Sequence, residues 1–392
     1  MAEIILSKNI TPSKIKDLYE TSMNQQNLKD VTLTIPNSIN KYTFGLLADI
    51  LKFIITLNNK TSIKVLKIDI DLENIDFLYD QEYAYPIISL LWNTADFVDK
   101  NNLDIKAVLR EKQNIFFIAM NSLAKIKGNK YTLTHTDHLS KNRGLVRLLE
   151  SSFGFNDDEE QITNSIKKIL YNNVLTFNKN NKIELEKIIE DIGAIVYELA
   201  KNTYEWGKTD SNSIDIPASI RGVYFRFHIN KDEKIQEDFY NTPLEQFFKH
   251  PVILKDSLNN QKKIYYLEIL IFDSGVGFID KFNEKNDLND LQIIKKCLVK
   301  NQTSSISNLK SKKGLGLDRI LNILNKKGFI RISTDKYCVY RDLIKDNYSP
   351  IEINQLESLK LDDWNNNSFN IESVTKSQGS YLSILYPFKS SN

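Results

Sequence analysis

One helical segment constrains this chain more than any other, because it carries two kinds of side chain on two faces. In residues 183–206 (IELEKIIEDIGAIVYELAKNTYEW) the apolar residues recur at helical spacing: Ile188, Ile192, Ile195 and Leu199. That stripe predicts a helix packed on a hydrophobic core. Glu198, Asn202 and Glu205 follow one another at intervals of four and three residues, so they share a second stripe. A polar stripe on a helix commonly faces solvent. Motifs later in the sequence indicate whether this stripe faces solvent or a binding site.

The length of 392 residues exceeds what one hydrophobic core usually organises, and about 150 residues per domain suggests two domains. The composition, 41% hydrophobic and 26% charged, is that of a globular chain able to bury a core. We place the predicted boundary near residue 155, giving an N-terminal domain (1–155) and a C-terminal domain (156–392).

Charge and cysteine content exclude several classes of protein. Fifty-two Lys and Arg residues against fifty Asp and Glu residues leave a formal charge of +2, which gives nucleic acid binding no support. Two cysteines, Cys297 and Cys338, allow neither a disulfide framework nor a four-cysteine zinc site. No apolar run approaches the ~20 residues that span a bilayer, and the first ten residues do not resemble a signal peptide. We therefore expect a cytoplasmic protein with no membrane association.

The N-terminal domain is predicted to be a small α/β unit. Residues 30–36 and 62–72 have the β-branched alternation of strands, and residues 42–57 between them are typical of a helix. A second helix is predicted over residues 85–100. This order of elements is loosely similar to that of STAS regulatory domains.

A glycine-containing turn follows the second of two predicted strands, 221–229 and 263–272. In DSGVGF, Asp273 stands at the strand end, and Gly275 and Gly277 follow it. Two glycines one residue apart let the backbone turn sharply and approach a flat ligand, while a carboxylate there can accept a hydrogen bond from an exocyclic amine. A simple turn would also explain the glycines.

A second glycine motif precedes a predicted helix in SKKGLGLDRILNILNKKG, residues 311–328. It consists of Lys312, Lys313, Gly314, Leu315, Gly316 and Leu317. Free N–H groups and the helix dipole at such a position favour an anion such as phosphate. The polar stretch 301–313 before it is typical of a lid. A strand is predicted over 328–334, and another over 377–388 opens with Gly379 and Ser380.

The order of these motifs, E-x-x-x-N, D-x-G-x-G, G-x-G-L and a late Gly-Ser, resembles the GHKL superfamily of gyrases, heat-shock chaperones, histidine kinases and MutL proteins. The resemblance covers residues 156–392 and does not extend to the first domain. It implies an α/β sandwich, the Bergerat ATP-binding fold, with ATP and Mg²⁺ as ligands.

The resemblance also implies roles for single residues. Asp273 would read the adenine, and Gly275 and Gly277 would make room for the base. Asn202 would hold magnesium through its side-chain oxygen, since Mg²⁺ takes few protein ligands. Glu198 would orient or deprotonate the attacking water.

The remaining motif residues match the nucleotide-binding positions of the family. Gly314, Leu315, Gly316 and Leu317 would form the end of the lid, with Lys312 and Lys313 as phosphate contacts. Ser380 stands where the family usually has a threonine near the adenine, so a hydroxyl is kept. Glu205 matches the acidic residue found three positions after the asparagine. Trp206 stands where anti-sigma-factor kinases have a histidine, which leaves the subfamily open.

We expect an Mg²⁺-dependent ATP-binding protein that hydrolyses ATP slowly or uses it as a conformational switch. Two alternatives stay open: a protein kinase that transfers the γ-phosphate to Ser, Thr or His of a partner, and a non-catalytic ATP-binding interaction module. An autokinase would need an upstream phosphoacceptor, and only His135 and His138 precede the pocket, in the segment 131–142 that we interpret as a loop.

Partners are expected from the resemblance alone. The N-terminal domain is expected to sense a signal or contact a protein partner. Dimerisation is common in the superfamily, so a homodimer is an expectation by analogy. A regulatory or antiviral-defence role in bacteria is compatible with the breadth of the family.

Overall fold

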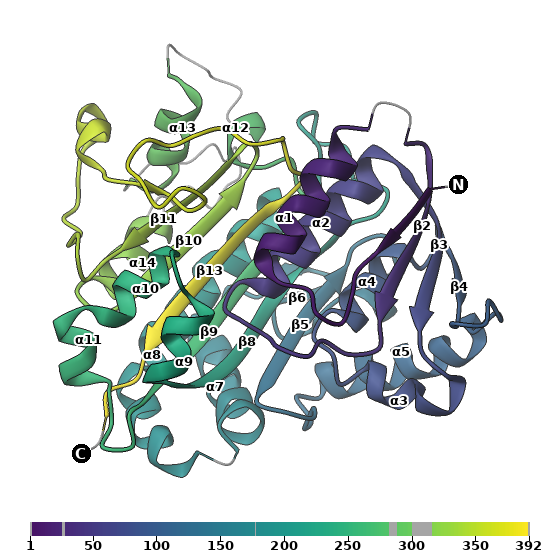
Figure 1. The fold of residues 1–392 in the computed structure, drawn as a ribbon, viewed down its shortest axis with the longest axis horizontal. Coiled ribbons are helices and arrows are strands. Elements are labelled where there is room, and N and C mark those ends of the chain that lie inside the picture. Colours follow the sequence, from purple (N-terminus) through teal and green to yellow (C-terminus); the bar gives the residue numbers. More distant parts are fainter. Residues whose placement is uncertain (1, 26–27, 177, 282–287, 300–315, 391–392) are drawn as a thin grey trace.

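The computed structural model describes residues 2–25, 28–176, 178–281, 288–299 and 316–390. Over these residues the chain is mixed α/β and forms two main sheets, one of four parallel strands and one of seven antiparallel strands (Figure 1). We call them the parallel sheet and the antiparallel sheet. The α/β class expected from the sequence is thus confirmed.

The parallel sheet belongs to the first hundred residues. Its strands, in spatial order, are β1 (Ala2–Ile5), β2 (Asp30–Pro36), β3 (Ser62–Asp69) and β4 (Asp96–Val98). The helices in and after this region are α1 (Pro12–Met23), α2 (Leu46–Lys60), α3 (Ile75–Leu78), α4 (Ala84–Leu91) and α5 (Lys106–Asn121). The predicted strand, helix, strand unit over 30–72 is confirmed.

The antiparallel sheet is assembled from distant parts of the chain. Its strands, in spatial order, are β12 (Asp362–Asp363), β11 (Tyr337–Asp342), β10 (Phe329–Thr334), β13 (Ser380–Pro387), β9 (Lys263–Asp273), β8 (Ile220–Lys231) and β5 (Lys130–Thr136). The strands predicted over 221–229, 263–272, 328–334 and 377–388 correspond to β8, β9, β10 and β13. Strand β5 comes from the range assigned to the N-terminal domain, yet it pairs with β8.

The later helices vary from one turn to eight. They are α6 (Lys141–Gly144), α7 (Glu159–Ile169), α8 (Lys179–Trp206), α9 (Asp232–Asp238), α10 (Pro243–Lys249), α11 (Pro251–Asp256), α12 (Phe278–Lys281), α13 (Asp290–Cys297) and α14 (Gly316–Leu324). A short hairpin joins β6 (Glu150–Ser151) to β7 (Gly154–Phe155). Short 3₁₀ segments lie at Leu72–Asn74 and Ile353–Ser358, and a π-helical segment lies at Leu170–Val174.

The central part of the antiparallel sheet is buried on both faces, and strand β9 shows this with apolar residues pointing to both sides. On β9, Ile269 and Ile271 belong to the core shared with α7, α8 and α14. Leu270 and Phe272 alternate with them along the strand and so point to the opposite face, where they belong to the core shared with α2 and α4. Figure 1 shows α2 lying against β13 on this second face. The N-terminal helices therefore form one cover of the sheet, and α8 forms part of the other.

Two predictions about local structure were wrong. The helix expected over 85–100 ends at Leu91, where the N–H of Ala95 bonds the Leu91 carbonyl. Phe97 then enters β4 opposite Leu66, because the parallel sheet can bury it completely. The segment 131–142, interpreted as a loop, begins with β5, whose residues find backbone partners on β8.

Buried polar side chains join the N-terminal layer to the antiparallel sheet. Arg331 of β10 is 3% exposed, and its guanidinium donates to both carboxylate oxygens of Asp49 on α2, with Nη1 3.2 Å from Oδ2. Glu268 of β9 is fully buried and accepts from the N–H of Gly45 at 2.9 Å and from His228 at 2.7 Å. These pairs keep charged groups satisfied where the N-terminal helices pack on the sheet.

Removing one partner of the Arg331 pair should destabilise the fold strongly. In Asp49→Ala the guanidinium stays buried without its carboxylate, and we expect the free energy of unfolding to fall by about 3–5 kcal/mol. Urea unfolding followed by circular dichroism measures this. The double variant Asp49→Ala/Arg331→Met should recover part of the loss. Asp71→Ala, which breaks the exposed pair with Lys100, should leave the midpoint nearly unchanged. Equal losses in Asp49→Ala and Asp71→Ala would contradict the assignment.

Candidate functional site

Helix α8 is the element on which the predicted site depends. It runs from Lys179 to Trp206, and Gly207 follows as its C-cap. The predicted apolar stripe faces the core: Ile192, Ile195 and Leu199 are buried, and Ile188 is partly buried. The residues of the polar stripe, Glu198, Asn202 and Glu205, are each half-buried. The stripe therefore lies between the core and the surface instead of on an open solvated face.

Glu198 is held by an arginine that the sequence motifs did not single out. Arg319 of α14 donates from Nη1 to Glu198 Oε1 at 3.3 Å and pairs with Glu159 of α7 at 2.7 Å. Burial raises the pKa of the Glu198 carboxyl, and Arg319 offsets this in part. A carboxylate whose pKa is raised is a better proton acceptor at neutral pH than an exposed glutamate.

The start of α14 meets the polar stripe at Gly316. A Cβ added at Gly316 would lie 3.3 Å from Glu198 Oε2 and 3.4 Å from Asn202 Nδ2, so the glycine brings the α14 backbone close to both side chains. Leu317 is buried in the core beside α8. The other residues of this predicted motif lie outside the described residues: Lys312, Lys313, Gly314 and Leu315.

The Asp273 turn meets the other end of the α8 stripe. Asp273 Oδ1 accepts from the N–H of Gly275 at 2.8 Å and from that of Ser380 at 3.3 Å. A Cβ added at Gly207 would lie 2.6 Å from Asp273 Cβ, and one at Gly275 would lie 2.7 Å from the Trp206 carbonyl oxygen. Burial raises the pKa of Asp273 to about 6, and the two N–H donors lower it in part.

Gly277 closes the turn against a second buried carboxylate. Its φ of +91° favours glycine, and an added Cβ would lie 2.4 Å from Asp335 Oδ2. The same Oδ2 accepts from the N–H of Ile279 at 3.0 Å at the start of α12. Thr334 Oγ1 accepts from the N–H of Phe278 and lies 3.4 Å from Ser380 Oγ. Asp335 and Thr334 thus support the turn from β10.

The geometry brings two separate motifs to one helix. Trp206 is eight positions after Glu198, which at 1.5 Å per residue is about 12 Å along the axis of α8. The beginning of α14 contacts α8 beside Glu198, and the Asp273 turn contacts α8 beside Trp206. Ser380, from the start of β13, joins the second group through its backbone N–H.

Several residues beside the site were missed in the sequence. Lys281 of α12 donates to Thr209 at 2.9 Å, and its ammonium lies 5.6 Å from the centre of the Trp206 ring. Burial lowers the pKa of Lys281. Arg319 could have been found, because it follows the G-L-G-L motif by two residues on the same helix as Gly316. Its partner Glu159 comes from α7, and no local pattern links the two.

The two upstream histidines are not placed as phosphoacceptors. His135 is 1% exposed, and its Nδ1 accepts from the Val146 N–H at 3.2 Å. Burial and the charge of Arg221 hold the pKa of His135 well below its usual range. His138 is bonded through Nε2 to the Ser89 carbonyl at 3.1 Å. Both imidazole rings therefore form hydrogen bonds with backbone groups of the protein.

Comparison with known proteins gives no assignment: no protein-family model, curated protein or solved structure matches this chain. Among the described residues, no group of three or more His, Cys, Asp and Glu side chains is arranged to hold a metal ion. In the same part of the chain, no helix combines the length and apolar character needed to cross a bilayer. The arguments about function therefore rest on residues and geometry.

The buried carboxylate of Asp273 should make the protein less stable as pH rises. Its pKa is about 6 in the fold and about 4 in an unfolded chain, so the folded state binds more protons between these values. Stability should fall across that window. Asp273→Asn removes the charge and keeps an oxygen for the two N–H donors, so at pH 7 it should be more stable than wild type by up to about 3 kcal/mol.

Urea unfolding at pH 7 and below pH 4 checks this, because the advantage of Asp273→Asn should vanish at the lower pH. Asp215→Asn, which changes an exposed carboxylate, is the matched control and should show no such dependence. A stability difference that is the same at both pH values would contradict the prediction.

Proposed function

We propose that this chain binds ATP with Mg²⁺ through a GHKL-type domain and hydrolyses it slowly, as an enzyme or an ATP-driven conformational switch. One observation carries the proposal: α8 contacts the start of α14 beside Glu198 and Asn202, and the Asp273 turn beside Trp206. These are three of the four motifs whose order suggested the superfamily, and Asp273 lies 75 residues after Glu198 and 43 residues before Gly316.

The Asp273 end is suited to the base. Asp273 Oδ1 accepts from two backbone N–H groups, and an ionised carboxylate has acceptors but no donor to offer a ligand. An exocyclic amine of adenine would donate to it. Gly275 packs against the Trp206 carbonyl so closely that a side chain there would clash, which holds the turn backbone against the end of α8.

The Glu198 end is suited to the phosphates. Gly316 lies at the N-terminus of α14, where N–H groups without helical partners favour anions. Asn202 offers a carboxamide oxygen of the kind that Mg²⁺ accepts, and its side chain faces this N-terminus. Magnesium would neutralise charge on the β- and γ-phosphates.

Glu198 supplies the chemistry in this proposal. A water beside its carboxylate gives up a proton to Glu198 while the water oxygen bonds to the γ-phosphorus and the bond to the β,γ-bridging oxygen breaks. The products are ADP and phosphate. Arg319 orients the carboxylate by its bond to Oε1, and burial raises the pKa of Glu198, which favours its role as base.

The arrangement of layers supports the same family. The antiparallel sheet packs α7, α8 and α14 on one face, and these two layers support our proposal of an α/β sandwich of the Bergerat type. The parallel sheet with α1, α2 and α4 is the part that we compare with STAS domains. We propose that it senses a signal or contacts a protein partner, because it covers the opposite face of the sheet that carries Asp273.

The fate of the γ-phosphate tests the function directly. With γ-labelled ATP and Mg²⁺, wild type should release labelled phosphate over an hour. Glu198→Ala should release roughly a hundredfold less, because general base catalysis typically contributes this much, and should still retain ATP on a filter. Glu190→Ala, on an exposed position of the same helix, is the control and should behave as wild type.

The outcomes separate the remaining functions. Label that moves onto the protein or an added partner identifies a kinase. Label that stays in bound ATP with wild type identifies a binding module or a switch awaiting its partner. Equal release from wild type and Glu198→Ala would contradict hydrolysis at this site.

ATP affinity tests the base-binding end independently. Asp273→Asn replaces an acceptor with an amide, and we expect ATP to bind roughly tenfold more weakly or worse. Isothermal titration measures this. Since the same variant is expected to be more stable at pH 7, a loss of affinity cannot be attributed to unfolding. An unchanged affinity for ATP would contradict the proposal that Asp273 contacts the base.

A further inference from the structure

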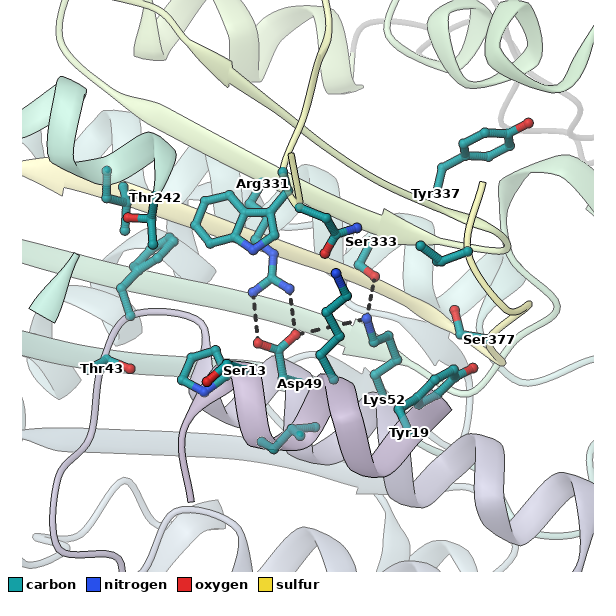
Figure 2. Close-up of a pocket in the computed structure, with 18 of the residues that line it drawn as sticks. Ser13, Tyr19, Thr43, Asp49, Lys52, Thr242, Arg331, Ser333, Tyr337 and Ser377 are labelled. Carbon is teal, nitrogen blue, oxygen red and sulfur yellow. Dashed lines mark hydrogen bonds and ion pairs between the residues drawn. The ribbon is translucent and has the colours of Figure 1, made fainter. Parts of the chain in front are cut away.

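A cavity of about 300 Å³ lies between the N-terminal helices and the antiparallel sheet, on the face opposite α8 (Figure 2). Its wall is built by α1, α2 and β10, by the chain that leads into α10, and by parts of residues 364–377. The volume is at the lower end of the range for small-molecule pockets. Its described lining does not include Glu198, Asn202 or Asp273, so this is a different place from the proposed nucleotide site.

Cations from three elements line this cavity. Lys16 comes from α1, Lys52 from α2 and Arg331 from β10. In Figure 2 the Lys52 ammonium points to Ser333, whose Oγ accepts from it at 3.3 Å. Lys52 also lies 4.0 Å from Asp49, but both oxygens of Asp49 already accept from Arg331. One carboxylate is therefore shared by two cations.

The other carboxylates of the lining are engaged or lie at the edge. Asp238 pairs with Lys41. Asp335 accepts from the backbone N–H of Ile279. Glu20 is on an exposed position of α1.

Lys16, which Glu20 follows by one helical turn, is on an exposed position as well. The whole lining has four carboxylates against three cations, but beside Lys52 the two cations Lys52 and Arg331 share the single carboxylate of Asp49. This part of the wall therefore has one uncompensated positive charge, which favours an anionic group.

Aromatic rings line the same cavity. The Arg331 guanidinium lies 4.5 Å from the centre of the Trp364 ring, and the Lys52 ammonium lies 5.7 Å from that of Tyr19. Thr43 adds a hydroxyl that is buried and has no hydrogen-bond partner among the described residues. Rings beside cations and a free hydroxyl suit a planar body with an acidic group.

We propose that this cavity binds a small planar organic anion. Its carboxylate, sulfonate or phosphate group bonds Lys52 and Lys16, and its ring lies beside Trp364. The ligand would be separate from the proposed nucleotide and would contact both the N-terminal layer and β10.

The fluorescent aromatic sulfonate 1-anilinonaphthalene-8-sulfonate tests the proposal on the full chain. We expect saturable binding of one probe per chain, weakened roughly tenfold by Lys52→Met and also weakened by Lys16→Met, since each removes a charged hydrogen bond to the sulfonate. Lys52→Arg keeps the charge and should retain binding. Lys60→Met changes an exposed lysine on the same helix and should bind as wild type.

A neutral probe of nearly the same shape, N-phenyl-1-naphthylamine, isolates the role of charge. It should bind roughly tenfold more weakly than the sulfonate to wild type, and Lys52→Met should abolish this preference. Circular dichroism of each variant shows that it is folded. Equal binding of the two probes to wild type, or sulfonate binding that Lys52→Met leaves unchanged, would overturn the proposal.

Discussion

The ion pair between Arg331 and Asp49 decides how the two layers of this protein meet. A guanidinium in the middle of a sheet strand cannot be buried without a partner, and the partner is supplied by α2, 282 residues earlier in the chain. Gly45 allows this approach, because a Cβ there would lie 2.7 Å from Arg331 Nη1, and its own N–H bonds Glu268. The start of α2 is thereby fixed over β10 and β9.

Once the N-terminal helices are fixed, the antiparallel sheet has no solvated face. Each of its central strands must then be apolar on both sides, and β9 and β13 satisfy this with nearly continuous apolar runs. The strands end where the turn at Asp273 and the start of β13 at Ser380 come together. The rigid sheet thus holds these two backbone segments in register beside α8, as a binding site requires.

Local patterns predicted the parts of the site that are local. The stripe of α8 follows from helical spacing, and the turn after β9 follows from Asp273, Gly275 and Gly277. Contacts between distant segments were not predictable in this way. Nothing around Arg319 indicates that it bonds Glu159, and nothing in 130–136 indicates that β5 pairs with β8 instead of the parallel sheet. Such partner choices depend on which surfaces the rest of the fold leaves uncovered.

The cavity beside Lys52 and the turn at Asp273 are joined by one short piece of chain. Ser377 lines the cavity and donates from its N–H to the Asp335 carbonyl at 2.8 Å. The next residue, Gln378, donates from its side-chain amide to the Gly275 carbonyl. Its backbone N–H donates to the Thr56 hydroxyl of α2 at 3.0 Å.

Asp335 adds a second connection, since it lines the cavity and its carboxylate lies against Gly277 and holds the first turn of α12. A change in the position of α2 relative to β10 therefore has to alter either the bond to Thr56 or the bond to Gly275. Because both bonds belong to Gln378, this residue connects α2 of the N-terminal layer to the Asp273 turn. That shared residue gives a physical basis for communication between the two faces of the sheet.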